Sequence, residues 1–471
     1  MNMKRTPIPV RLQNAINTIL RREDYHIPKL KENSETLMNF LHARQPPTET
    51  EEIQKRAREI ESQLSTKNLI DAEGDDKALR LEMNRRRSIV QRKLRRQMYH
   101  WQPVEFDAAK AITYMVTRMI PEYCILYRIF SEMKKRQSEF KPHTLFDFGS
   151  GVGSVAWAAN EVWPKHLHEH YCVDSSSDMN TLFRLLVQDA EENKETWMKG
   201  LFQKQFFPQS HENKYSLVVS AYSLFELPNR HVRRSRIVDL WQKTEENGFL
   251  VFVENGTNAG FKLIIEARRI ILQEMRRSTQ ENSSSHGHIF SPCPHEAFTC
   301  PMTNQLKSPC NFEIKYEPLE YISNGVPKTE RFSYVVFRKG HSQSEDLSWP
   351  RIIRPVSKPS KHVHCRICSA NGKLEHHVLS ARLNGKDLYK CARKSDWGDL
   401  LPATDIRHSQ ESSSDQLQSD DVFSNVKHNE DSPKTIVSTT SNNAVTDVTS
   451  NDQDINCDDV IINDLYPDLN S

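Results

Sequence analysis

A glycine-rich turn separates an apolar segment from a run of small residues, and two acids stand beside it. The turn is Gly149-Ser150-Gly151-Val152-Gly153, and Asp147 precedes its first glycine by two residues. Glycines let a backbone approach a ligand closely, and the following helix offers unpaired N–H donors. A second apolar segment ends at Asp174, 27 positions after Asp147. These residues predict a nucleoside site, where Asp147 receives an ammonium group and Asp174 accepts two ribose hydroxyls.

The spacing of the glycines indicates which nucleoside ligand to expect. A dinucleotide turn reads G-x-G-x-x-G, whereas this one reads G-x-G-x-G and resembles the S-adenosylmethionine loop of class I methyltransferases. Two alternatives remain: the glycines form a plain tight turn, and Asp174 is a helix N-cap before Ser175. The residues expected to bind the cofactor are Asp147, Gly149, Gly151, Gly153 and Asp174.

The residues expected to line the active-site cleft, at the ends of the third and fourth strands, include no recognisable catalytic group. Amine methyltransferases that act on nucleic acids carry an Asp/Asn-Pro-Pro-aromatic tetrad, where this chain has Ser220-Ala221-Tyr222-Ser223. RNA methyltransferases with a cysteine nucleophile need a thiol there, and this sequence has none. Tyr222, Glu226 and Glu254 are polar candidates, but no catalytic residue is assigned.

The cysteines are concentrated in one half of the chain. Six of nine lie between Cys293 and Cys391, which favours a metal site over a disulfide framework. Cys293, Cys300 and Cys310 are spaced C-x6-C-x9-C beside prolines, so a fourth ligand must come from a distant segment. Zinc ribbons usually carry C-x-x-C pairs, and irregular proline-flanked loops suit a [4Fe–4S] cluster. Thiolates alone do not separate zinc from iron–sulfur, and unligated cysteines are the third possibility.

Alternating strands and helices predict a mostly parallel α/β sheet covered on both faces. The expected strands and helices after the first glycine-loop strand are strand 171–174, helix 179–192, strand 215–220, helix 233–244, strand 249–253, helix 259–275, and a closing antiparallel pair at 312–316 and 332–338. Residues 98–136 are expected to be helical, with an interruption near Pro121. The predicted regions are a helical N-terminal region with a basic helix (1–125), an S-adenosylmethionine-binding Rossmann-like domain (126–340) with a cysteine insert (291–311), a small β-rich module completing the metal site (341–401), and a disordered acidic tail (402–471).

The net charge of +2 conceals two oppositely charged parts. Residues 402–471 carry 14 acids against 3 Lys/Arg, which leaves +13 for residues 1–401. Residues 77–100 alone hold nine Lys/Arg and one Glu, a stretch that can line a phosphate backbone or be a solvated helix face. A polyanionic partner is therefore favoured. No membrane partner is expected, because no run approaches the roughly 18 apolar residues of a spanning helix.

Five motifs, in order, resemble the methyltransferase-like protein 17 family over about residues 7–401. They are Asp147–Gly153, Ser223–Pro228, Glu254–Thr257, Cys293–Glu296 and Trp397–Leu400. This resemblance implies a class I methyltransferase fold that binds S-adenosylmethionine, together with a four-cysteine [4Fe–4S] site. It also implies a place in the mitochondrial matrix and a role in mitochondrial translation. The implied partners are the rRNA and ribosomal proteins of the small mitochondrial ribosomal subunit, with the free protein a monomer.

Carried over by position, the resemblance gives Cys293, Cys300, Cys310 and Cys368 as cluster ligands, with Cys368 preferred over Cys365. The first cysteine gap is one residue longer than the family leads us to expect. The first 22 residues contain no acid, as in a mitochondrial presequence, but they also fit an ordinary amphipathic helix. The short N-terminus leaves little room for a removable presequence, so the mitochondrial location rests on the resemblance.

The function expected from these features is assembly of the small mitochondrial ribosomal subunit through rRNA binding. Two alternatives stay open. One is an active S-adenosylmethionine-dependent rRNA methyltransferase, because the fold supports that reaction even though no catalytic group is assigned. The other is an RNA-binding structural protein held together by zinc.

Overall fold

The structure is a computed structural model, and it describes residues 6–22, 25–64, 76–97, 101–210, 212–280, 286–303, 308–319, 326–340 and 348–402. The chain divides into two compact units, one of residues 1–49 and 98–407 and the other of residues 50–97 and 408–471. The tail expected at 402–471 lies outside the described residues beyond Pro402.

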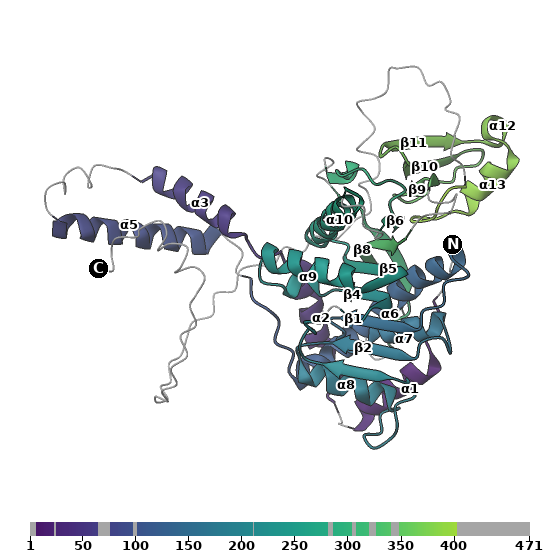
Figure 1. The fold of residues 1–471 in the computed structure, drawn as a ribbon, viewed down its shortest axis with the longest axis horizontal. Helices are drawn as coiled ribbons and strands as arrows, with labels where there is room; N and C mark the ends of the chain where they lie inside the picture. Colours follow the sequence, from purple (N-terminus) through teal and green to yellow (C-terminus); the bar gives the residue numbers. More distant parts are fainter. Residues whose placement is uncertain are drawn as a thin grey trace. The chain divides into compact units, whose positions relative to one another are not determined.

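An eight-stranded sheet forms the centre of the first unit (Figure 1). Its strand order is β3-β2-β1-β4-β5-β8-β6, with β7 paired to β8. The first five strands are parallel, and β8 is antiparallel to both β5 and β6. This order confirms the class I methyltransferase fold, a doubly wound sheet whose strand order reverses at β1 and β4. The strands are β1 (Thr144–Phe148), β2 (Glu169–Val173), β3 (Leu201–Lys204), β4 (Tyr215–Ala221), β5 (Thr244–Asn255), β6 (Gly287–Ser291), β7 (Phe312–Tyr316) and β8 (Lys328–Lys339).

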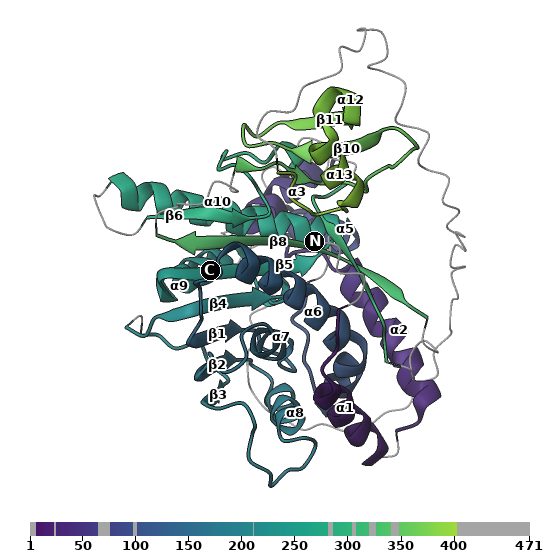
Figure 2. The ribbon, with the colours of Figure 1, turned by 90° about the vertical axis from the view of Figure 1, so that its right-hand side faces the viewer.

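Neighbouring residues of the central strands enter two different hydrophobic cores. Leu145 and Leu217 face one core, whereas Phe146 and Val218 face the other. Alternate side chains of a strand point to opposite faces of the sheet, so both are buried where helices cover both faces. Figure 2 shows the helices of the two faces on either side of the sheet. The first face carries α6 (Ala108–Arg136), α7 (Ser154–Val162) and α8 (Ser177–Val187), and the second carries α9 (Arg230–Lys243) and α10 (Asn258–Gln280).

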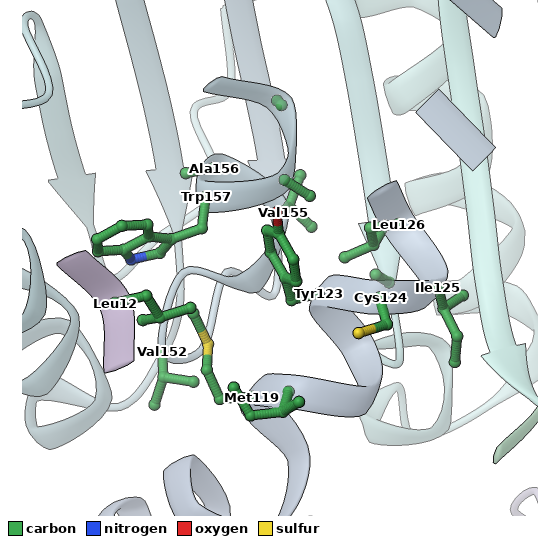
Figure 3. Packing of buried hydrophobic residues seen from close by; sticks show 14 of the residues in the cluster. Leu12, Met119, Tyr123, Cys124, Ile125, Leu126, Val152, Val155, Ala156 and Trp157 are labelled. Atoms are coloured by element: carbon green, nitrogen blue, oxygen red, sulfur yellow. The ribbon is translucent and has the colours of Figure 1, made fainter. Parts of the chain in front are cut away.

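The larger core joins the N-terminal helices to the sheet (Figure 3). Met119 and Tyr123 of α6 are packed with Val155 of α7 and with Leu12 of α1 (Val10–Arg22). The buried residues of α1 recur at three- and four-residue spacing, which gives the helix one apolar face. A second helix, α2 (Ile27–Ala43), packs against α6.

Helix α6 corrects one expectation, because it continues through Pro121 instead of breaking there. Proline removes one amide donor and costs about 3 kcal/mol in a helix interior. Here the side chains of residues 115–126 are all buried, and their packing outweighs that cost. The helix begins at Ala108, where the Asp107 carboxylate accepts a hydrogen bond from the Lys110 amide at 2.8 Å.

Two strands were not expected from the sequence, and one helix ends early. Strand β3 is only four residues long, and β6 directly precedes the cysteine segment. The expected closing pair is present as β7 and β8, but β8 also pairs with β5 and β6. Helix α8 ends at Val187 because Asp189 and Ala190 adopt positive φ angles of 57° and 63°.

The C-terminal module contains a three-stranded antiparallel sheet in the order β11-β10-β9. Its own small core includes Val363, Cys365 and Leu379. Its elements are β9 (Arg351–Ile352), β10 (Val363–Cys368), β11 (Leu374–Leu379), α12 (Ala381–Asn384) and α13 (Lys386–Lys394).

The described part of the second unit is a pair of helices, α3 (Thr50–Ser62) and α5 (Asp76–Gln97). They bury Ala57 and Ile60 of α3 and Val90 and Leu94 of α5. Most of the basic side chains of α5 are exposed, but Arg86 is buried beside Glu82. Among the described residues, no helix has both the length and the apolar character needed to cross a membrane.

Candidate functional site

The glycine turn lies at the carboxyl end of β1, where a doubly wound sheet places its ligands. Gly149, Gly151 and Gly153 all have positive φ, at 74°, 49° and 87°. A Cβ on Gly149 would lie 2.4 Å from Ser223 Cβ, and one on Gly153 would lie 2.2 Å from the Phe183 ring. These two positions therefore require glycine both for their backbone angle and for their close packing.

Asp174, at the end of β2, already supports this turn. Its Oδ2 accepts a hydrogen bond from the Gly151 amide at 2.8 Å, and its Oδ1 accepts one from the Ser176 amide at 2.9 Å. Burial raises the pKa of Asp174, and the two amides oppose that shift. The side-chain N-cap of the next helix is Ser176, whose Oγ accepts from the Met179 amide. Asp174 therefore faces the glycine turn, and the N-cap role proposed as its alternative falls to Ser176.

Asp147 is fully buried within β1, and neither of its carboxylate oxygens has a hydrogen-bond partner among the residues that the structure describes. Burial raises its pKa well above the usual range, and the nearby Asp174 and Glu122 add to the shift. A buried polar atom without a partner is costly unless something else satisfies it. The Ser150 and Tyr222 hydroxyls are also buried without a partner. Tyr222 is among the residues that line the cavity beside the turn, whereas Asp147 and Ser150 are not, so a ligand in that cavity would meet the Tyr222 hydroxyl directly.

A cavity of about 70 Å³ opens beside the turn and is lined by Gly149, Gly151 and Asp174. Arg44 and Glu226 also line it and form an ion pair, and the Val104 amide donates to Glu226 at 3.0 Å. Ligand pockets usually measure about 300–1,000 Å³. A nucleoside ligand would therefore require the segments that carry Arg44 and Val104 to move.

A buried polar network on α6 forms another wall of this cavity. Arg118 donates to Glu122 at 3.1 Å and to Glu330 at 3.0 Å, and its guanidinium lies 5.0 Å from the Tyr222 ring centroid. Glu122 also accepts from the Tyr114 hydroxyl at 2.6 Å. Sequence reasoning missed this network. An Arg and a Glu four residues apart inside an otherwise apolar helical stretch were the available signal.

The end of β4, where a methyl acceptor would sit, carries no ready base. Tyr222 has a φ of 59°, and its amide donates to Val253 O at 2.8 Å. Burial raises the pKa of its phenol well above the usual value, so it stays protonated. The Ser220 and Ser223 hydroxyls bond to each other at 2.7 Å. Glu254 is fully buried and accepts from the Leu224 amide at 3.0 Å, so it is held away from the cavity lining.

The structure brings Cys293, Cys300, Cys310 and Cys368 together. Burial raises the pKa of Cys310 well above its usual value, and the other three thiols raise it further. Burial also raises the pKa of Cys368, with further contributions from Cys293 and Cys300, and Cys293 likewise acts on Cys300. All six pairs of these thiols thus lie within electrostatic reach of each other. Cys365, three residues before Cys368, instead packs into the core of the C-terminal module.

The surroundings of this cysteine group suit an anionic centre. Arg268 is 1% exposed and lowers the pKa of both Cys300 and Cys368, whereas Arg354 lowers that of Cys310. The Arg268 Nε and His295 Nε2 atoms are buried without hydrogen-bond partners. Over the described residues, however, no three His, Cys, Asp or Glu side chains stand as they would around a metal ion. The thiols of Cys293, Cys300, Cys310 and Cys368 therefore lie near one another without the arrangement that a single metal ion requires.

A buried ion pair also ties the C-terminal module to the methyltransferase-like domain. Arg351 of β9 donates to Glu132 of α6 at 2.7 and 3.1 Å, and to Ser291 Oγ and Pro292 O at 3.0 Å each. Strong interaction with Arg351 lowers the pKa of Glu132 to about 2, against the opposing effect of burial. This pair joins residues 219 apart and was not foreseen from the sequence.

Known proteins similar to this chain agree with its fold. A family profile described as mitochondrial small ribosomal subunit Rsm22 matches residues 108–402. The human mitochondrial ribosome assembly protein METTL17 is 40% identical over 80% of this chain and 78% of its own length. The Schizosaccharomyces pombe Rsm22-cox11 tandem protein 2, also mitochondrial, is 27% identical over 62% of this chain and 43% of its own length.

Solved structures add only a distant likeness. The ribosomal protein L11 methylase from Lactobacillus delbrueckii subsp. bulgaricus is 14% identical, with a TM-score of 0.25, and covers 46% of this chain and 77% of its own. The fold assignment rests on the strand order and not on this similarity. Both the profile and the human relative cover well over half of this chain. The chain therefore belongs to the mitochondrial small ribosomal subunit Rsm22 family, and it is a homologue of the ribosome assembly protein METTL17 with a methyltransferase-like fold.

Proposed function

We propose that this protein is an assembly factor of the small mitochondrial ribosomal subunit, acting in the mitochondrial matrix by binding rRNA and ribosomal proteins. The observation that carries the proposal is that the charges in the cavity beside the glycine turn already pair with one another. Arg44, Arg118, Glu122 and Glu226 line the cavity together with Tyr222, and their charges are already paired as Arg44–Glu226 and Arg118–Glu122. The relatives named for ribosome assembly agree with this role.

S-adenosylmethionine is the cofactor that the first site fits best. Asp174 would accept the ribose hydroxyls, the turn from Gly149 to Gly153 would follow the ligand closely, and Asp147 would receive its ammonium group. The unpartnered oxygens of buried Asp147 support this assignment. When bound, the cofactor supplies an activated methyl group. The residues of this chain bind and orient it without offering a base for an acceptor.

The cysteine group fits a [4Fe–4S] cluster held by Cys293, Cys300, Cys310 and Cys368. A single zinc ion binds four sulfurs at about 2.3 Å in a tight tetrahedron, whereas a cluster of four irons and four sulfides spaces its thiolates more widely. The support for a site at these four cysteines is that Cys310 lies within electrostatic reach of the other three thiols. Unpartnered donors on Arg268 and His295 could bond to its sulfurs. Bound there, it would link three cysteines of the methyltransferase-like domain to one of the C-terminal module.

The rRNA-binding surface proposed here includes the exposed basic side chains of α5. Arg80, Arg87, Arg92, Lys93 and Arg95 are all exposed or half-exposed on this helix. Each Lys or Arg that neutralises a phosphate adds salt-dependent affinity. A helix that only faces solvent could carry the same charges, so the affinity of α5 for RNA is the property to measure.

The test is complementation of cells that lack the protein, comparing wild type with Asp147→Ala and Gly151→Arg. An assembly factor predicts that any defect appears as lost small subunits on sucrose gradients, with every rRNA methyl mark intact on the subunits that form. Mapping of the small-subunit rRNA by primer extension and bisulfite treatment reads those marks. A missing mark on subunits that assemble normally would contradict the proposal and show active methyl transfer. The unpartnered Tyr222 hydroxyl in the cavity is what favours that second function.

A further inference from the structure

The connection between β3 and β4 is unusually short for this kind of sheet. Consecutive parallel strands in such a fold are usually joined by a dozen or more residues that include a helix, and this connection must also cross β2 and β1, which lie between β3 and β4 in the sheet. Here residues 205–214 make the connection, and its described residues, 205–210 and 212–214, contain no helix. On the face of the sheet that carries α9 and α10, α9 packs on β4 and β5, and α10 packs on β5 and β8. The part of the face over β2 and β3 therefore keeps side chains that a crossover helix would normally cover.

Those side chains are aromatic. The Tyr171 and Phe146 rings stack with centroids 5.5 Å apart, and Tyr215 lies 5.1 Å from Phe146. Phe202 of the edge strand β3 pairs in register with Tyr171, so both side chains lie on this face. Phe202 is 50% exposed, and Phe206, just beyond the strand, is 83% exposed. The exposed rings of Phe202 and Phe206 thus lie at the edge of a cluster of packed aromatic side chains.

Basic side chains border these rings. Lys204 is exposed and shares the face of Phe202, because the two residues are two apart on the strand. Lys214 at the start of β4 is also exposed. The Arg236 guanidinium lies 3.8 Å from the Phe207 ring centroid. Asp239 pairs with Arg236 at 3.2 Å and Glu169 begins β2, so Lys204 is the cation placed on the strand face of Phe202.

We propose that this aromatic face, formed by Tyr171, Phe202 and Lys204 and continued by the exposed Phe206 just beyond β3, binds unpaired nucleotides of single-stranded RNA. Bases stack on exposed aromatic rings whatever their sequence, and lysines beside the rings contact the phosphates. This inference rests on the proposed rRNA-binding function and gives it a second surface besides α5. A duplex cannot use such a face, because its bases are already stacked inside the helix.

The charge around the rings decides between RNA and a protein partner. An apolar protein segment would gain from contact with Phe202 and Phe206 but would not need the positive charge of Lys204. A nucleotide strand uses both, because each nucleotide offers one flat base and one phosphate.

The test measures binding of the full-length protein to a fluorescent twelve-nucleotide uridine RNA and to a duplex of equal length by anisotropy. We expect the double variant F202L/F206L to bind the single strand about tenfold more weakly or worse, because stacking on an aromatic ring is lost. F202Y/F206Y keeps the rings and should bind as wild type does. Leucine keeps the apolar character, so an equal affinity of the leucine variant would overturn the proposal and point to a protein partner. Unchanged thermal unfolding verifies that both variants fold.

A second measurement locates the contact directly. Uridine RNA that carries 4-thiouridine, irradiated on the wild-type protein, should form crosslinks that mass spectrometry places on Phe202, Phe206 or Tyr171. Crosslinks confined to α5 would overturn this inference and leave the proposed rRNA-binding function standing. A protein that binds neither RNA would instead overturn the proposed function itself.

Discussion

At the scale of single residues, the site is built from groups held in unfavourable states. Asp147 and Glu254 are fully buried, and burial raises the pKa of each. The turn places three glycines at positive φ, two of them against close neighbours. The residue types of Asp147 and Asp174 and the glycine spacing were readable from the sequence, because they lie in one local motif. The partners Ser223 and Phe183 were not, since they approach only through the folded sheet.

The glycine positions should differ in their tolerance of alanine. Gly153→Ala places a Cβ 2.2 Å from the Phe183 ring at a φ of 87°, and backbone strain with overpacking should cost about 2–5 kcal/mol of unfolding free energy. Gly151→Ala has a φ of 49° and meets no atom within 4 Å, so it should cost only about 1–2 kcal/mol of backbone strain. Urea unfolding of the two variants measures the difference. Equal losses would show that the contact with Phe183 is not limiting.

Glu254 makes stability depend on pH. Burial raises its pKa from 4.5 to about 8, so the folded protein holds a proton there that the unfolded chain releases above pH 4.5. Its contribution is therefore complete below that pH and falls as the pH rises towards 8. Glu254→Gln should raise the unfolding free energy at pH 8 by up to about 4 kcal/mol and change it little at pH 5. Thermal unfolding at both pH values tests this, and an equal change at both would rule out ionisation as the cause.

At the scale of elements, strong periodicity made the central strands and α6 to α10 predictable. The short strands β3 and β6 escaped because four or five residues carry too little pattern. Continuation of α6 through Pro121 escaped because burial of both flanks outweighs the local rule. The attachment of the C-terminal module escaped for a different reason, because Arg351 and Glu132 are 219 residues apart.

Breaking that attachment should free the module. Arg351→Met removes the two hydrogen bonds from Arg351 to Glu132 and leaves that carboxylate with Arg136, which donates to it at 2.9 Å, so it should cost about 1.5–3 kcal/mol of unfolding free energy. Limited proteolysis should then cut near residue 348 faster than in wild type. Arg393→Met removes an arginine whose hydrogen bonds, within the described residues, go to Pro359 O and Tyr389 of the same module; it is the matched control and should not expose that site. Unchanged cleavage of Arg351→Met would mean that other contacts hold the module.

At the scale of the whole molecule, one chain would carry three proposed sites: a site for S-adenosylmethionine, a [4Fe–4S] cluster held by four cysteines, and surfaces that bind RNA. The family and the fold followed from five short motifs whose order matches that of the family. The basic helix α5 was expected from the sequence, but its grouping with α3 in a second unit and the exposed aromatic side chains at β3 were not, because both depend on how the chain packs after folding. The central claim is that thiols from two distant segments hold one inorganic centre.

The most direct test is the iron and acid-labile sulfide content of full-length protein purified without oxygen. Wild type and Cys365→Ser should each hold about four irons and four sulfides per chain, because Cys365 packs in the module core away from the other thiols. Cys368→Ser should lose most of both and the brown absorbance with them. Colourless wild-type protein with one zinc per chain would contradict the account, as would a cluster that survives in Cys368→Ser and disappears in Cys365→Ser.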